Sequence, residues 1–314
     1  MDIIIHADDF GIAREQSERI LKCARDGALN SLSVLVGSPA FEQCAALLDE
    51  RPQHLRVGLH LNLVEGPCCA DPAHIPMLAD ASGMFCNSFA GLLRLSMSSR
   101  HYELVEQVAI EAQAQLERFL RRFPELARHL RVDGHQHFQL IPAVFEGMLL
   151  ALARVDCKVE YLRIPAEPLK PFVDRALLPK IEPINWAKHS LLNFCWQQDC
   201  LRLQAQPFQT ALFCGVLFSG EMSAERVVQV MPAYVELARL QGLDVEFLFH
   251  PGGVEDAHDM LNPDLDGFVD FYRSPGRGIE YDALMSQELA RCIEQAKENL
   301  EGNTRGDVLV GNAV

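Results

Sequence analysis

The sequence is short of basic residues for its length. Its 314 residues include 28 lysines and arginines against 43 aspartates and glutamates, which gives a formal net charge of −15. Negative charge of this size repels the phosphate backbone of nucleic acids, and no basic stripe in the sequence offsets the repulsion. We therefore expect no nucleic-acid partner, and we expect a neutral or cationic small molecule as the substrate.

Long apolar runs are also missing. The sequence has no stretch of about eighteen apolar residues, the length that a membrane-spanning helix requires, and it begins without the basic and apolar segments of a signal peptide. Its ten cysteines lack the paired spacing of zinc fingers; they are Cys23, Cys44, Cys68, Cys69, Cys86, Cys157, Cys195, Cys200, Cys214 and Cys292. Buried free thiols are typical of a reducing compartment, so we predict a cytoplasmic protein without a membrane partner.

Strand and helix patterns alternate from the first residues onward. The β-branched run from Ile3 to Ile5 predicts a buried strand, because such residues lose side-chain freedom in a helix. Helical spacing over 12–25 and 40–48 separates this strand from two further apolar strands, at 31–37 and 56–63. This alternation is typical of parallel βα units.

Four later segments also read as strands, at 130–133, 158–165, 215–218 and 244–249, which brings the expected total to seven or eight. Helices are expected at 102–123, 143–154, 177–208 and 281–299, with Pro232 restarting a broken helix after residue 220. Periodicity fails near 64–100 and 251–280, which we interpret as loop insertions over the mouth of the fold. The prediction is one domain over 1–314, a distorted (β/α) barrel related to the TIM barrel, with mostly parallel strands.

Polar side chains follow the predicted strands. Asp8 and Asp9 end the first, His60 ends the third, and His135 and His137 follow the fourth. The loops after barrel strands meet at one face, and a catalytic divalent metal takes about three ligands from histidine and carboxylate. A metal site is therefore expected there, although two aspartates at a strand end can also cap the next helix. His135 and His137 would share a strand face, so the sequence pattern alone leaves either as the ligand.

Four short motifs, in this order, resemble the YdjC-like carbohydrate deacetylases, a family that includes chitooligosaccharide deacetylase: Ala7-Asp8-Asp9-Phe10-Gly11, Gly58-Leu59-His60-Leu61, Asp133-Gly134-His135-Gln136-His137 and Phe249-His250-Pro251. The resemblance implies hydrolytic N-deacetylation of an N-acetylated amino sugar or short oligosaccharide, with release of acetate. It maps the metal ligands onto Asp9, His60 and His135, the base onto Asp8 and the acid onto His250. His6 departs from the asparagine expected at its position, which leaves the surroundings of the base open.

Other assignments follow from these. Arg163, His137 and Tyr161 are candidate substrate-binding residues, although Arg163 could instead anchor Asp8 or form a surface ion pair, and Tyr161 could belong to the core. Asp133 could orient a neighbouring imidazole or form a turn before Gly134. We expect zinc or magnesium as the single divalent ion and a homodimer as a candidate assembly. Two alternatives remain at this point: a metal-dependent phosphoesterase and a sugar-binding protein without turnover.

Overall fold

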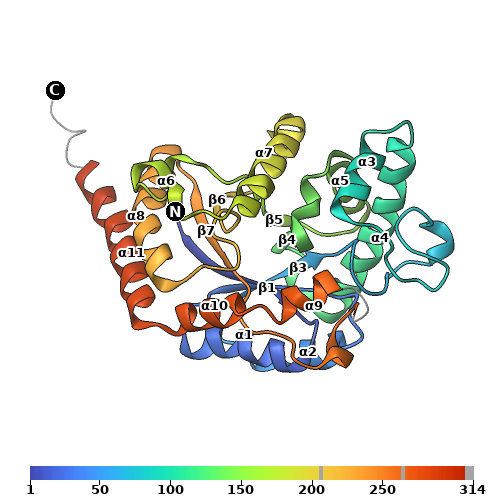
Figure 1. Ribbon diagram of the computed structural model, residues 1–314, viewed down its shortest axis with the longest axis horizontal. Coiled ribbons are helices and arrows are strands. Elements are labelled where there is room, and N and C mark those ends of the chain that lie inside the picture. Colours follow the sequence, from blue (N-terminus) through green and yellow to red (C-terminus); the bar gives the residue numbers. More distant parts are fainter. Residues whose placement is uncertain (205–207, 263–265, 308–314) are drawn as a thin grey trace.

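Seven parallel strands organise the protein. The computed structural model describes residues 1–204, 208–262 and 266–307. Within these ranges the strands form one sheet in the order β5-β4-β3-β2-β1-β7-β6 (Figure 1). Their bounds are β1 Ile3–Phe10, β2 Ser31–Val34, β3 Arg56–Leu61, β4 Leu130–Gly134, β5 Val159–Leu162, β6 Ala211–Cys214 and β7 Asp244–Phe249. Every strand pair is parallel, which puts all the strand C-termini on one face.

The two edges of the sheet approach each other. Gln209, just before β6, forms a parallel bridge with Tyr161 of β5. The Leu162 N–H donates to the Gln209 carbonyl at 3.0 Å, and the Gln209 N–H donates to the Glu160 carbonyl at 3.0 Å. The sheet therefore curls into a barrel-like shape with its strands in chain order, and the predicted distorted (β/α) barrel is confirmed.

Helices surround the sheet. The main ones are α1 Arg14–Asp26, α2 Phe41–Ala46, α3 Phe89–Ser96, α4 His101–Arg122, α5 Pro142–Arg154, α6 Lys170–Asp174, α7 Pro183–Gln204, α8 Ala224–Gln241, α9 Asp266–Tyr272, α10 Gly276–Met285 and α11 Gln287–Asp307. The strands β1, β2 and β4 are buried along their whole length, as expected of parallel strands covered on both faces. The apolar stripe of α4, which includes Val108, Leu116 and Phe119, is buried core packing.

The strand predicted at 215–218 is wrong. The observed strand, β6, ends at Cys214, and the residues that follow it form a turn. Their backbone groups pair with a side chain: the N–H groups of Gly215 and Leu217 donate to the Glu167 carboxylate at 2.8 and 2.6 Å. An apolar segment whose N–H groups are satisfied in this way has no ladder to join.

Two helix predictions also need correction. Pro232 lies inside the continuous helix α8, where buried Val227, Met231 and Tyr234 hold the helix together despite the missing N–H group. The terminal helix predicted at 281–299 is two helices, α10 and α11, separated at Ser286. The extended backbone of Ser286 ends α10, and its hydroxyl accepts the N–H of Leu289 in the first turn of α11.

The two insertions contain helices of their own. The 64–100 segment includes α3, and the 251–280 segment includes α9 and the start of α10. Figure 1 shows α7 on one side of the barrel mouth, with α3 and α5 on the other. Among the residues that the structure describes, no helix combines the length and the apolar character needed to cross a membrane.

Candidate active site

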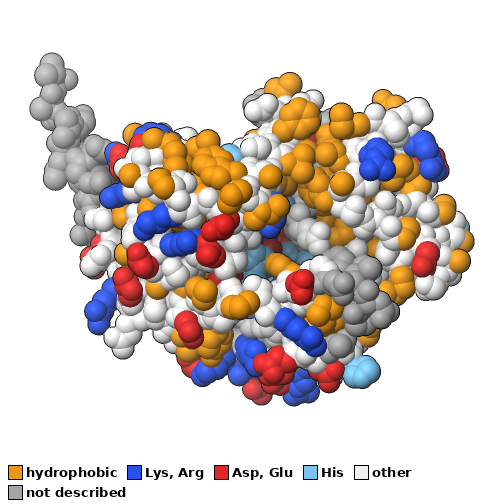
Figure 2. Space-filling view, viewed as in Figure 1, with side chains coloured by type: hydrophobic (Ala, Val, Ile, Leu, Met, Phe, Trp, Pro, Cys, Tyr) orange, Lys and Arg blue, Asp and Glu red, His pale blue; other side chains and the backbone are white. Residues whose placement is uncertain are grey.

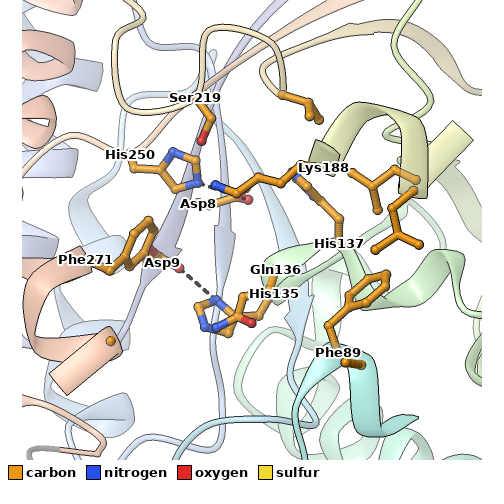
Figure 3. Close-up of a pocket in the computed structure, with 15 residues that line it drawn as sticks. Asp8, Asp9, Phe89, His135, Gln136, His137, Lys188, Ser219, His250 and Phe271 are labelled. Atoms are coloured by element: carbon orange, nitrogen blue, oxygen red, sulfur yellow. Dashed lines mark hydrogen bonds and ion pairs between the residues drawn. The ribbon is translucent and has the colours of Figure 1, made fainter. Parts of the chain in front are cut away.

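The end of β1 brings two adjacent carboxylates into one cavity. Asp9 adopts a left-handed conformation with φ of 68°, and the pairing of β1 with β2 shifts register between Ala7 and Phe10. Gly11 follows with φ of 102°, where an added Cβ would lie 2.8 Å from the carbonyl oxygen of Leu35. Figure 3 shows both carboxylates at the cavity. This backbone turn explains how neighbouring residues share a site, and its strain is of the kind found at functional sites.

Three donor atoms from separate strand ends converge beside Asp9. Its Oδ1 lies 3.1 Å from His135 Nδ1 and 3.5 Å from His60 Nε2, and those two nitrogens are 3.3 Å apart. Ligand atoms placed about 2.0–2.2 Å from one ion are separated from each other by roughly 2.8–3.6 Å in tetrahedral or octahedral geometry. All three side chains are buried. The group therefore fits one divalent ion.

A carboxylate lies behind each imidazole. His60 Nδ1 donates to Asp133 Oδ1 at 2.6 Å, and His135 Nε2 donates to Glu65 Oε2 at 2.9 Å. Tyr272 Oη also donates to Glu65 Oε2 at 2.9 Å. Such partners fix the ring orientation and leave the other nitrogen free to bind metal. Asp133 thus orients an imidazole, which is one of the two roles that the sequence left open for this residue.

Neighbouring carboxylates raise the pKa of both imidazoles. Burial lowers the pKa of His60, but the charges of Asp8 and Asp133 outweigh burial and raise that pKa to about 10. His135 follows the same pattern: hydrogen bonds to Asp9 and Glu65 raise its pKa to about 9. Because a metal binds the neutral imidazole, a divalent ion would compete with protons for these two rings.

Replacing Asp133 by asparagine tests the orienting role. We expect the variant Asp133→Asn to bind zinc about 10–100-fold more weakly, because losing the partner of a metal-bound histidine typically has this effect. Isothermal titration calorimetry of the metal-free protein measures the change. The control is Asp156→Asn, which alters an exposed carboxylate paired with Arg128. Equal zinc affinity in wild type and Asp133→Asn would argue against the role.

Asp8 lies beside the three-atom group but is held by different partners. Arg163 Nη1 donates to both of its oxygens, at 2.8 and 2.9 Å, and the Ser33 hydroxyl donates to Oδ1 at 3.4 Å. Burial raises the pKa of Asp8, but the Arg163 guanidinium, together with His60 and His6, holds this pKa well below its usual range. His6 Nε2 lies 3.3 Å from Asp8 Oδ1 and 3.2 Å from Asp133 Oδ2. Asp8 is therefore an ionised carboxylate at the cavity, and His6 bridges it to Asp133.

His250, after β7, faces Asp8 across the cavity. Its Nε2 lies 4.0 Å from Asp8 Oδ2, and its Nδ1 lies 3.5 Å from Glu280 Oε2 (Figure 3). The Glu280 carboxylate also accepts the backbone N–H of His250 at 2.5 Å. The side chain of His250 is 15% exposed, in contrast to the fully enclosed imidazole of His60. Its partly open position lets it reach a bound molecule.

The structure places His137 at the cavity but outside the three-atom group. His137 has φ of 61°, packs edge to face against Phe213 with ring centres 5.5 Å apart, and has a buried Nδ1 without a hydrogen-bond partner. Burial lowers its pKa to about 3, so the ring is neutral. The left-handed backbone at Gln136 and His137 breaks the alternation expected of a strand, which is why His135 alone reaches Asp9.

Arg163 and Tyr161 lie behind the site, in the barrel interior. Arg163 is completely buried, and its guanidinium contacts Asp8, Asp133 and Glu246. Tyr161 is 4% exposed, and its hydroxyl donates to Glu246. Neither residue lines the cavity, whereas His137 does. Of the three roles considered for Arg163, the geometry agrees with anchoring Asp8, and complete burial excludes a surface ion pair.

Four charged residues of the site were missed in the sequence: Glu65, Glu246, Arg277 and Glu280. Glu65 belongs to the first insertion, and Arg277 and Glu280 belong to the second, where they lie in helix α10. No periodicity in these segments marks an inward side chain. Glu246 offered one, because it is the charged residue in the middle of the apolar strand sequence Val245-Glu246-Phe247, and such a residue needs a buried partner.

The cavity is large enough for a small molecule and mainly apolar at its walls. Its volume is about 600 Å³. Figure 2 shows a hollow with histidine side chains at its bottom and hydrophobic side chains around it. The walls come from α3, α7, the turn after β6 and α9, and the lining residues besides Asp8, Asp9, His135, His137 and His250 are Phe89, Ala90, Gln136, Lys188, Leu191, Leu192, Val216, Ser219, Gly267 and Phe271.

Comparisons with known proteins find one matching family model, several similar sequences and a solved structure of similar fold. The family model for the YdjC-like protein matches residues 2–295. A carbohydrate deacetylase of Mus musculus is 29% identical over 80% of this chain and 77% of its own. A chitooligosaccharide deacetylase of Proteus mirabilis is 32% identical over 74% of this chain and 82% of its own. A crystal structure of a proposed cellobiose-phosphate cleavage protein from Enterococcus faecalis has a TM-score of 0.67, covers 94% of each chain at 20% identity, and shows the fold alone.

Proposed function

Because the chain belongs to the YdjC-like family, we propose that it removes the acetyl group of an N-acetylated amino sugar or short oligosaccharide by metal-dependent hydrolysis. One observation carries the proposal: donor atoms of Asp9, His60 and His135 that could hold a metal ion converge beside the ionised carboxylate of Asp8, and Asp8, Asp9 and His135 line one cavity. The relatives named above are carbohydrate deacetylases, so their names support the same reaction.

The residues divide the reaction between them. A divalent ion held by Asp9, His60 and His135, with zinc and magnesium as the candidates, would polarise the amide carbonyl and make water more acidic. Asp8 accepts the proton of the attacking water, and Arg163 keeps this carboxylate ionised and correctly placed. His250 donates a proton to the departing amine nitrogen. Arg163 and Tyr161 lie behind the site and do not line the cavity, so we propose His137 as the residue that contacts the substrate.

Acetate release is the direct test. The full chain, with one equivalent of zinc or magnesium, should release acetate from N-acetylated chitooligosaccharides, and the chelated protein should not. The readout is enzyme-coupled acetate detection over time. A sugar-binding protein without turnover would bind the same oligosaccharides and release no acetate, which would contradict the proposal.

The acid role of His250 predicts a dependence on the leaving group. We expect His250→Gln to lower the rate on an N-acetylated sugar by about 10²–10⁴-fold, the usual contribution of a positioned acid. The loss should be much smaller on an acetanilide with an electron-withdrawing ring, because its amine departs with less need of a proton. His258→Gln, an exposed histidine, is the control. An equal loss on both substrates would assign His250 a different role.

A two-metal phosphoesterase agrees less well with the site. A second group of potential ligands, His6, Asp8 and Asp133, lies next to the first. Arg163 already supplies a cation there, with Nη1 2.8 Å from Asp8 and Nη2 3.1 Å from Asp133. A second metal ion would face the fixed positive charge of this guanidinium. We propose one metal ion per chain, which elemental analysis of the loaded protein measures.

Location and assembly are further parts of the proposal. The nine cysteines whose side chains the structure describes are all free, which supports a reducing compartment such as the cytoplasm. All strands in the described ranges belong to one sheet, which supports a single barrel domain. The homodimer stays a prediction that light scattering of the purified protein tests.

A further inference from the structure

An arginine from the C-terminal part of the chain contacts the second carboxylate oxygen of Asp9. Arg277, in the first turn of α10, donates from Nη2 to Asp9 Oδ2 at 2.9 Å. The two residues are 268 positions apart in the sequence and are buried to 3% and 1% exposure. The two oxygens of Asp9 therefore have different partners. Oδ1 faces the two imidazoles, and Oδ2 faces the guanidinium.

Arg277 is fixed by more than this ion pair. Its Nε donates to the Phe271 carbonyl at 3.1 Å, and its Nη1 donates to the Gly252 carbonyl at 3.3 Å. The guanidinium also lies over the rings of Phe271 and Tyr272, 4.2 and 4.9 Å from their centres. The three nitrogens thus bond to three separate acceptors, an arrangement that the rigid fork of arginine permits and that lysine cannot copy.

Asp9 needs such support. Its left-handed backbone is strained for a residue with a side chain, and strain of this kind persists only where the surroundings hold it. A carboxylate with both oxygens free could rotate or bind an ion through both of them. With Oδ2 occupied, only Oδ1 points to the nitrogens of His60 and His135.

We propose that Arg277 is a positioning residue that holds Asp9 in its metal-binding conformation and restricts it to ligation through Oδ1. The proposal rests on the metal site described under the proposed function. It extends that site to α10, so the barrel core and the second insertion together define the geometry of one ligand.

Zinc affinity separates positioning from simple electrostatics. If the guanidinium only repelled the ion, removing its charge in Arg277→Met would tighten zinc binding, and Arg277→Lys would bind like wild type. If it positions Asp9, both variants should bind zinc about 10–100-fold more weakly, as is typical when the partner of a metal ligand is lost. The control is Arg273→Met, a neighbouring exposed arginine that donates to the Glu255 carbonyl.

The experiment uses the full chain, freed of metal and titrated with zinc by calorimetry at one pH, with a second titration by Co²⁺. Freeing Asp9 Oδ2 should also change the visible absorption of the Co²⁺ protein, because the ligand set changes. Unaltered zinc affinity and Co²⁺ spectrum in Arg277→Lys, or tighter zinc binding in Arg277→Met, would overturn the proposal. If Arg277→Met does not fold, Arg277→Lys decides alone. Failure of the wild type to bind zinc and Co²⁺ would instead contradict the metal site itself.

Discussion

The variant Asp8→Asn is expected to keep its metal and lose its turnover. Asparagine has the shape of aspartate but cannot accept the proton of the attacking water, so acetate release should fall by about 10²–10⁴-fold. Asp8 is not one of the three converging donors, and Asp9, His60 and His135 are unchanged in the variant. Elemental analysis should therefore still find one metal ion per chain. The measurement combines that analysis with the rate of acetate release from an N-acetylated oligosaccharide.

The variant Asp156→Asn makes the same chemical change at an exposed position and controls for general effects. Circular dichroism of Asp8→Asn should match that of wild type, because Arg163 still contacts Asp133 and Glu246. A rate within a factor of a few of wild type would exclude Asp8 as the base. Loss of metal together with the rate would instead place Asp8 among the ligands.

The variant Asp9→Asn is expected to lose both metal and turnover. Removing one of three protein ligands, the one with a negative charge, should leave the site unable to retain a divalent ion through gel filtration. Asparagine tolerates the left-handed backbone at this position, whereas alanine would add strain, so Asp9→Asn is the cleaner variant and Asp9→Ala should also lose stability. Elemental analysis and acetate release measure the two effects.

Asp9→Asn also leaves Arg277 without its buried carboxylate partner, which should lower the melting temperature of the metal-free protein. Comparison with Asp8→Asn distinguishes the roles of the two aspartates, because the Asp9 variant should lose its metal and the Asp8 variant should keep it. Retention of one metal ion per chain in Asp9→Asn would contradict the assigned ligand set.

The sequence could point to several residues of the site because each of them lies at the end of a strand. Asp9, His60 and His250 follow apolar runs that are easy to recognise, and parallel strands bring their C-terminal ends to one face. The spacing alone could not separate His135 from His137, because the choice depends on the left-handed backbone at Gln136 and His137. The family resemblance selected His135, and the structure places its Nδ1 3.1 Å from Asp9.

The supporting charges could not be predicted in the same way. Arg277 reaches Asp9 across 268 residues, and Glu65 reaches His135 from an insertion without periodicity. Local patterns carry no information about such contacts, because only the folded arrangement of the loops decides them. The misplaced strand at 215–218 has a similar origin: its backbone bonds to Glu167, about fifty residues earlier.

We propose that three distant segments hold one ion beside Asp8. Anomalous scattering from a crystal soaked in zinc would locate this ion. We expect one peak per chain, about 2.0–2.2 Å from Asp9 Oδ1, His60 Nε2 and His135 Nδ1. A peak among His6, Asp8 and Asp133 instead, or no peak at either group, would contradict it.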